Sequence, residues 1–188
     1  RYVFAALIIL FASAWPMWEF GMHDYQKTRV MTLLDPERDR FGAGWNIWQS
    51  KTAIGSGGWS GKGYMQGTQS QLNFLPESHT DFIVAVLAEE WGMLGVLCLL
   101  LLYLLIIMRI LVLAWMADTL FNKLVIASMG LTFFVYVFVN IGMVTGLLPV
   151  VGIPLPFISR GGTSIVSLMV AFGIVMALAH DKKQFSNN

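Results

Sequence analysis

Long runs of apolar residues dominate this chain and limit it to few possible structures. Four such runs occur, at residues 2–18, 82–108, 124–148 and 163–180. Each is long enough to cross a bilayer, although the first is close to the lower limit of about 17 residues. In lipid such a run must be helical, because only a helix satisfies its own backbone hydrogen bonds. We therefore expect an all-α polytopic membrane protein with four transmembrane helices, forming one membrane domain over residues 1–188.

The composition agrees with this expectation and excludes other classes of protein. Hydrophobic residues make up 56% of the chain and charged residues only 12%, against about 25% charged in an average soluble domain. A disordered chain, an ordinary soluble enzyme and a nucleic-acid binder, which would need far more than a net charge of +1, are excluded. The single cysteine, Cys98, rules out an internal disulfide and is expected to act as a small hydrophobic residue.

Basic residues predict the orientation of the chain. Arg109 and Lys123 flank the short connection between the second and third runs, and Lys182 and Lys183 follow the fourth. Cytoplasmic segments carry the excess of Lys and Arg, so both segments are expected inside the cell. Residues 19–81 then form a long loop outside the membrane.

The outer loop is too rich in large apolar residues to be a flexible linker. Within it we expect a short helix over residues 30–34, ended by Asp35-Pro36, and an amphipathic helix over 44–54 at the membrane surface. A second irregular segment, residues 149–162, holds three of the six prolines of the chain. It is too apolar for a solvent loop and too rich in proline for a helix, which predicts a re-entrant segment lining a cavity.

A glycine-rich stretch, Gly55–Gly63, allows two interpretations. Its spacing fits neither a phosphate-binding loop nor a dinucleotide-binding loop, because Ser56, Ser60 and Gly63 stand at positions that those motifs assign to other residues. The stretch forms either tight turns that need a positive φ or a set of backbone amides that approach an anionic ligand.

Titratable residues gather where the outer loop meets the second apolar run. Glu77, His79 and Asp81 fall within five residues. Ser78 and Asp81 have the spacing of a capping box, which would place Asp81 in the first helical turn. The alternative is chemistry, since a carboxyl group at a dry membrane edge can act as a base near neutral pH.

Further polar residues lie within or beside the apolar runs. Glu89 and Glu90 lie about two turns after Asp81, about 12 Å into the span, and their directions on a helix prevent both from sharing one cavity with Asp81. We expect one of the two to contact a neighbouring helix. Asn140 is expected to form an interhelical hydrogen bond. Arg160 is either an interfacial residue that extends its charge to water or a ligand of pyrophosphate.

Several of these segments match, in order, motifs of a known family. They include Ala53-Ile54-Gly55-Ser56-Gly57-Gly58, Gly67-Thr68-Gln69-Ser70-Gln71, Leu75-Pro76-Glu77-Ser78-His79-Thr80-Asp81 and the proline-rich stretch 149–156. On these motifs the whole chain resembles the SEDS family (shape, elongation, division and sporulation). The stretch 67–71 favours the elongation branch over the division branch. The resemblance implies the C-terminal half of a protein with about ten helices, here helices seven to ten.

The resemblance also implies a function in the bacterial inner membrane. Members of the family polymerise lipid II into glycan strands of peptidoglycan, with inversion at the anomeric carbon and an active site on the periplasmic face. They work with a class B penicillin-binding protein, which crosslinks the strands. The essential aspartate of the family corresponds to Asp81, with Glu77 and His79 as candidate supporting residues.

The leaving group of this reaction, undecaprenyl pyrophosphate, needs its charge neutralised. Candidates are Lys51, Lys62 and Arg160, together with a divalent cation, Mg²⁺ or Mn²⁺. Arg160 replaces the tyrosine that is usual in the family. Two alternatives to the enzyme stay open: a lipid II flippase, which would spread polar groups through the bilayer depth, and a non-catalytic scaffold for the penicillin-binding protein.

Overall fold

The computed structural model describes residues 19, 21–35, 42–68 and 80–180. Within these residues the chain is helical and contains no strand. The five helices are α2 (Asp24–Leu34), α3 (Ala43–Gly57), α5 (Ile83–Met116), α6 (Leu120–Val144) and α7 (Gly162–His180). The apolar run at residues 2–18 lies outside the described residues, so its prediction as a membrane span is untested.

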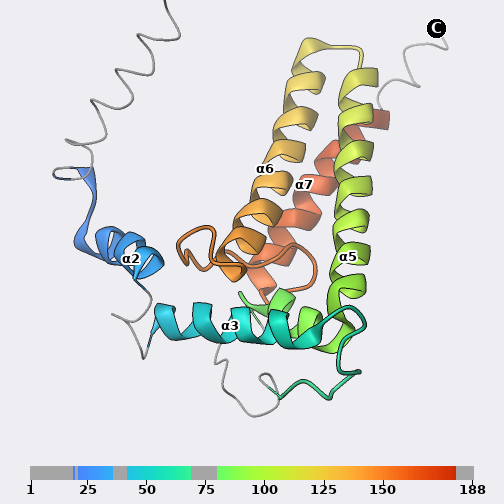
Figure 1. Cartoon of the computed structure of the whole chain (residues 1–188). Helices are drawn as coiled ribbons and strands as arrows, with labels where there is room; N and C mark the ends of the chain where they lie inside the picture. The colour runs from blue at the N-terminus through green and yellow to red at the C-terminus, as the bar shows by residue number, and fades with distance from the viewer. Residues whose placement is uncertain (1–18, 20, 36–41, 69–79, 181–188) are drawn as a thin grey trace, which may run out of the picture.

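Three helices are long and apolar enough to cross a membrane: α5, α6 and α7. They run side by side as a bundle, and a short connection joins α5 to α6 at one end (Figure 1). The predicted runs 82–108, 124–148 and 163–180 are thus confirmed as helices, with shifted ends. The largest shift is at the C-terminal end of α5, which continues to Met116 because its last turns contain no helix-breaking residue.

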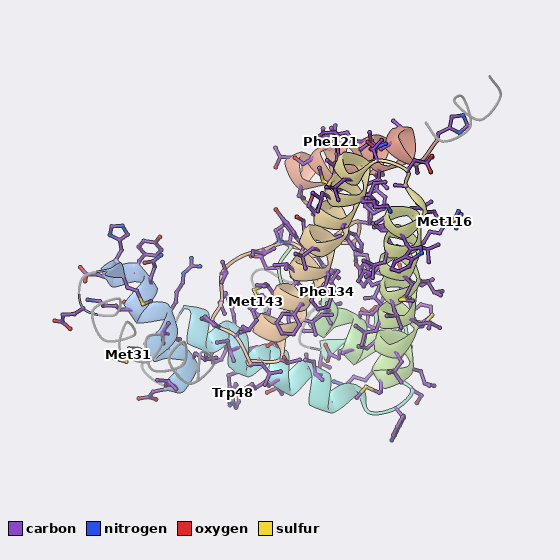
Figure 2. The ribbon with its side chains drawn as sticks, turned by 90° about the horizontal axis from the view of Figure 1, so that it is seen from above. Met31, Trp48, Met116, Phe121, Phe134 and Met143 are labelled. Atoms are coloured by element: carbon purple, nitrogen blue, oxygen red, sulfur yellow. The ribbon has the colours of Figure 1, made fainter. Side chains whose placement is uncertain are left out.

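Both helices predicted in the outer loop are present and longer than expected. Helix α2 ends at Leu34, directly before Asp35-Pro36 as predicted, but begins at Asp24, where His23 and Gln26 form a reciprocal capping box. Helix α3 lies across one end of the bundle (Figure 1). Its Ile47 and Ala53 side chains are buried, whereas Trp48 points away from the bundle (Figure 2).

Helix α5 is broken near its beginning. Gly92 has φ 66° and ψ −163°, which are not helical values. The part before Gly92 lies beside α3 at the end of the bundle, and the part after it forms the long membrane-spanning section (Figure 1). Glu89 and Glu90 lie in the part before the break, so the expected distance of about 12 Å along the helix does not place them inside the membrane-spanning section.

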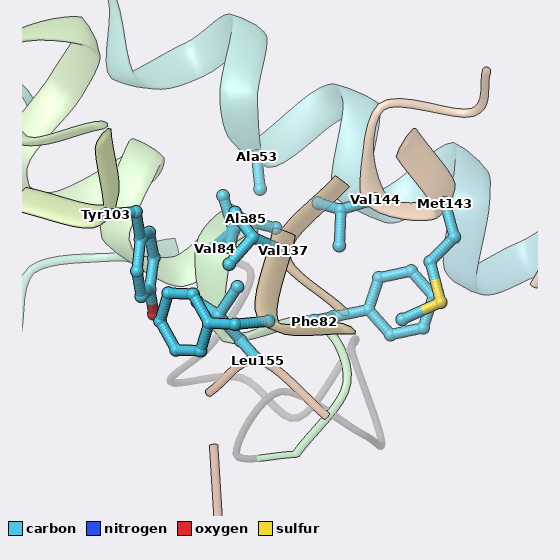
Figure 3. Packing of buried hydrophobic residues seen from close by; sticks show 10 residues of the cluster. Ala53, Phe82, Val84, Ala85, Tyr103, Val137, Met143, Val144 and Leu155 are labelled. Atoms are coloured by element: carbon cyan, nitrogen blue, oxygen red, sulfur yellow. The ribbon is translucent and has the colours of Figure 1, made fainter. Parts of the chain in front are cut away.

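A hydrophobic core joins these elements at the end of the bundle that α3 covers. It combines Ala53 of α3, Phe82 and Val84 at the start of α5, Val137 and Met143 of α6, and Leu155. Figure 3 shows the Phe82 ring extending toward Met143. The fully buried Phe82 therefore fixes the chain one residue after Asp81.

The segment between α6 and α7 has no helix, as predicted for residues 149–162. It returns to the bundle instead of extending into solvent. The Tyr103 hydroxyl donates a hydrogen bond of 2.7 Å to the carbonyl of Pro156. Phe157 packs against Phe133 of α6 and Phe172 of α7, with ring centroids 6.0 Å and 5.4 Å away. These contacts fix the segment against α5, α6 and α7.

Candidate active site

Asp81 lies in a turn that precedes α5, rather than in the first turn of the helix. The helix begins at Ile83, its N-cap is Phe82, and no acidic residue lies in its first turn. The capping-box interpretation of Asp81 is therefore wrong, because that motif needs the carboxylate at the third helical position. Asp81 is half-buried, and desolvation by this burial raises its pKa above the ordinary value. The shift is in the direction that a general base near neutral pH requires.

The Asp81 carboxyl group faces the segment between α6 and α7. Its Oδ2 atom lies so close to Gly152 that a Cβ atom at that position would be 3.3 Å away. Gly152 has φ 78°, a conformation that glycine adopts at little cost. The absence of a side chain and the turn of the backbone at Gly152 together let this segment pass directly over the carboxyl group.

Two buried side chains hold the backbone at Asp81 in place. The Asn140 amide of α6 donates to the carbonyl of Asp81 at 3.0 Å and to that of Ile153 at 2.7 Å. The Ser159 hydroxyl donates to the carbonyl of Thr80 at 2.5 Å and accepts from the Leu155 amide at 2.8 Å. The interhelical hydrogen bond expected for Asn140 is wrong, because both of its partners lie in non-helical segments. Sequence reasoning did not single out Ser159 or Gly152. For Asn140 the only sequence signal was its position as a polar residue within the apolar run 124–148.

Two of the three basic candidates lie on elements that surround this site. Arg160 is exposed and directly follows Ser159. Lys51 lies on α3 with its side chain over Gly146, where an added Cβ atom would lie 2.7 Å from Nζ. Both side chains are on elements that pack around Asp81.

The third basic candidate, Lys62, has a buried partner. Its Nζ atom lies 2.7 Å from Oε1 of Glu89, which has no exposed surface. The same oxygen accepts hydrogen bonds from the amide and the hydroxyl of Thr68, at 2.8 Å and 3.0 Å. Glu89 therefore contacts Lys62 and Thr68 in the stretch after α3, and Lys62 is occupied in neutralising it.

Within the glycine-rich stretch 55–63, residues 55–57 are the end of α3, and residues 58–63 form the tight turns of the first interpretation. Gly58, Gly61 and Gly63 all have positive φ. The stretch enters the break in α5: the amides of Lys62 and Gly63 donate to the carbonyls of Glu89 and Glu90, at 2.9 Å and 3.0 Å. These amides satisfy carbonyls that the broken helix leaves open, so they are not available to an anionic ligand.

The remaining predicted site features are untested. Glu77 and His79 lie outside the described residues. Within the described part of the chain no three His, Cys, Asp or Glu side chains come together as ligands for a metal ion. The divalent cation therefore stays a prediction.

A separate cavity of about 910 Å³ lies between α5 and α6. Its lining is almost wholly apolar, with residues such as Leu104, Met108 and Phe138, and it does not include Asp81. None of the charged side chains discussed above is among the residues that line this cavity.

The fold and the site define a helical membrane protein with a partly desolvated carboxyl group at one end of its bundle. The chain belongs to the FtsW/RodA/SpoVE family of cell cycle proteins, whose family model matches residues 1–184. This confirms the family resemblance drawn from the sequence motifs.

Two curated relatives illustrate the similarity. The chain is 56% identical over 188 residues to the peptidoglycan glycosyltransferase MrdB of Escherichia coli K12, covering all of this chain and 51% of the relative. It is 43% identical over 154 residues to the peptidoglycan glycosyltransferase RodA of Treponema pallidum, covering 82% of this chain and 36% of that one. The chain thus spans about half the length of the first of these relatives, and less of the second.

Solved structures give the same result. A peptidoglycan synthase complex, described for its coordination of polymerization and crosslinking, matches with a TM-score of 0.74 and 33% identity, over 96% of this chain and 50% of the other. A variant of the rod shape determining protein RodA of Thermus thermophilus matches with a TM-score of 0.57 and 32% identity, over 70% of this chain and 40% of that one.

Proposed function

We propose that this chain is the Asp81-bearing half of a peptidoglycan glycosyltransferase that polymerises lipid II for cell elongation. The protein would lie in the bacterial inner membrane, with its active site on the periplasmic face. The names of the relatives support the reaction class. The observation that carries the proposal is the position of Asp81, half-buried at the end of the bundle beneath Gly152, with its pKa raised by burial.

In this reaction Asp81 acts as the general base. Its carboxylate takes the proton from the 4-hydroxyl of the acceptor sugar as that oxygen attacks the anomeric carbon of the donor. The new carbon–oxygen bond forms on the face opposite undecaprenyl pyrophosphate, whose bond to the same carbon breaks. The α-linked donor therefore yields a β-1,4 linkage. The pyrophosphate leaves with the bonding electron pair and carries the charge that must be stabilised.

The basic residues differ in how well they suit that task. Arg160 and Lys51 are exposed on elements around Asp81, so they are the better candidates for pyrophosphate binding. Lys62 is the weaker one, because Glu89 already holds its charge. A divalent cation would serve the same neutralising role if Glu77 or other residues of the full protein hold it. General base catalysis supplies about 10²–10⁴-fold, so the positioning of two lipid-anchored substrates must supply much of the remaining acceleration.

The two alternatives fit the described residues less well. A flippase needs polar groups spread through the bilayer depth, whereas Glu89 precedes the break in α5 and Asn140 contacts the Asp81 backbone, near the same end of the bundle. A non-catalytic scaffold gives no reason for a partly desolvated carboxyl group at that end. We include a class B penicillin-binding protein as partner, since a similar complex couples polymerization with crosslinking.

The test is polymerisation of lipid II by the full-length protein with its penicillin-binding partner, whose transpeptidase is blocked. Asp81→Asn keeps the shape of the side chain but removes the base. We expect a loss of glycan polymer of about 10²-fold or more, with the complex intact on size-exclusion chromatography. Asp118→Asn, on the connection between α5 and α6, is the matched control and should polymerise normally. Undiminished polymer from Asp81→Asn would contradict the proposal.

A further inference from the structure

We propose that Asn140 is a positioning residue for the Asp81 carboxyl group. The inference rests on the proposed function, in which Asp81 is the base. Asn140 lies on α6, has no exposed surface and reaches two carbonyls that belong to different segments. One is the carbonyl of Asp81 itself, and the other is that of Ile153, next to the Gly152 position that the carboxyl group faces.

The hydrogen bonds fix the orientation of this amide. Both neighbours of Nδ2 are carbonyl oxygens, which can only accept, so the NH₂ group must point toward them. Its two hydrogens then serve the two carbonyls, one each. A flipped amide would place Oδ1 against two acceptors and lose both bonds. Asn140 therefore acts as a bridge that sets the separation between the Asp81 backbone and the backbone at Ile153.

The cost of this arrangement argues against a role in packing alone. With Nδ2 so placed, Oδ1 of Asn140 is buried without a hydrogen-bond partner among the described residues. A buried oxygen without a partner costs free energy, because on folding it loses its hydrogen bonds to water and gains none in return. We infer that this cost is tolerated because Asn140 fixes the separation between the backbones at Asp81 and Ile153, and so the position of the base.

Ser159 provides a second, independent attachment of the same backbone. Its hydroxyl holds the carbonyl of Thr80, one residue before Asp81, and also closes the turn at Leu155. Asn140 and Ser159 thus bind consecutive carbonyls from α6 and from the segment after it. With both in place, the backbone that carries the Asp81 side chain is held next to the segment of Gly152, which favours the position of the carboxyl group that faces Gly152.

This gives the inference a signature that a purely structural role lacks. A carboxyl group released from Gly152 gains water, so its raised pKa should fall toward the ordinary value. The acidic limb of the rate profile should therefore move to lower pH. At this end of the bundle the charged residues of the surrounding elements are Lys51, Lys62, Glu89, Glu90 and Arg160, whereas Arg109 of α5 and Lys123 of α6 lie at the other end. Within the described part of the chain Asp81 forms no ion pair with any of them.

The experiment uses the full-length protein in complex with its penicillin-binding partner and measures lipid II polymerisation against substrate concentration and pH. For Asn140→Leu we expect kcat to fall by about 10- to 100-fold, with a much smaller change in KM and an acidic limb shifted to lower pH. Ser159→Ala should lower kcat and shift the acidic limb to lower pH as well, each by a smaller amount. If Asn140→Leu does not fold, Ser159→Ala still tests the inference. Thr132→Val is the matched control, since its hydroxyl binds only the Ser128 carbonyl of its own helix and is exposed.

Two results would overturn the inference. One is a kcat close to that of the wild type in both Asn140→Leu and Ser159→Ala. The other is a lowered kcat with the acidic limb unmoved, which would indicate a structural role only. Asp81→Asn in the same assay separates this failure from failure of the proposed function. If Asp81→Asn is inactive, only the positioning role of Asn140 is contradicted. If Asp81→Asn polymerises normally, both the assignment of Asp81 as base and the positioning role are contradicted.

Discussion

Burial of the Asp81 carboxyl group has two effects: it raises the pKa of the group, and it lowers the stability of the folded protein at neutral pH. Burial raises the pKa of its carboxyl group in the folded protein. The folded state therefore holds its proton to higher pH than the unfolded state does. The favourable contribution of the protonated group is complete below the ordinary value of 3.8 and is lost as pH rises through the raised value.

This predicts that Asp81→Asn stabilises the protein near neutral pH while it abolishes activity. An amide carries no charge, so it avoids the desolvation cost of a buried carboxylate. Thermal unfolding of the purified complex from about pH 4 to about pH 8 measures the effect. The difference in Tm between variant and wild type should grow as pH rises. A variant less stable than the wild type at neutral pH would contradict the desolvation argument.

Gly152 supplies a second test at the scale of a single residue. Gly152→Ala should cost about 1–2 kcal/mol because of its positive φ, and its new methyl group would press on the Asp81 carboxyl group at 3.3 Å. We expect a small fall in Tm and a loss of polymerisation of about tenfold, since small displacements of a reacting group are costly. Gly58→Ala is the matched control: its φ is also positive, but an added Cβ atom meets nothing within 4 Å. It should lower Tm without lowering the polymerisation rate, and equal losses of rate would argue against a special role for Gly152.

At the scale of elements, the sequence predicted more about which segments are helical than about where helices bend. The apolar runs indicated α5, α6 and α7 because lipid-spanning segments must be helical. The break at Gly92 was missed, since an isolated glycine within an apolar run rarely stops a membrane helix. What breaks α5 is a tertiary contact: the loop after α3 supplies hydrogen-bond partners on both sides of the break, including Gly58 O for the Met93 amide at 2.9 Å.

The break at Gly92 is therefore expected to need glycine. In Gly92→Ala the Cβ atom would lie 2.4 Å from the Gly61 nitrogen and 2.6 Å from the Trp59 oxygen, in a residue with φ 66°. Backbone atoms cannot yield easily, so the free energy of unfolding should fall by about 3 kcal/mol or more. Gly173→Ala in α7 is the control, because nothing lies within 4 Å of the added Cβ atom. It should be neutral or stabilising by about 0.5–1 kcal/mol, as measured by unfolding in detergent micelles.

At the scale of the whole molecule, the candidate site is a meeting of segments far apart in the chain. The residues alone left a helix cap and a base open for Asp81, and the resemblance to the SEDS family led to its prediction as the base. Its partners could not be predicted in the same way. Asn140 lies 59 positions later and Ser159 lies 79 positions after Thr80. Only the packing of α6 and the segment after it against the start of α5 brings these side chains to the Asp81 turn.

The direction in which this assembly crosses the membrane is the last prediction. Arg109 and Lys123 predict that the connection between α5 and α6 is cytoplasmic, so we expect the opposite end of the bundle, with Asp81 and α3, to face outward. In a cysteine-free full-length protein, we expect Ser60→Cys to react with a membrane-impermeant maleimide in cells whose outer membrane alone is opened. Asp118→Cys should react only after the inner membrane is opened as well. Both positions are exposed, so access and not burial decides the result. The reverse pattern would place Asp81 in the cytoplasm, where it could not act on lipid II at the outer face, and the proposed polymerase would have to be abandoned.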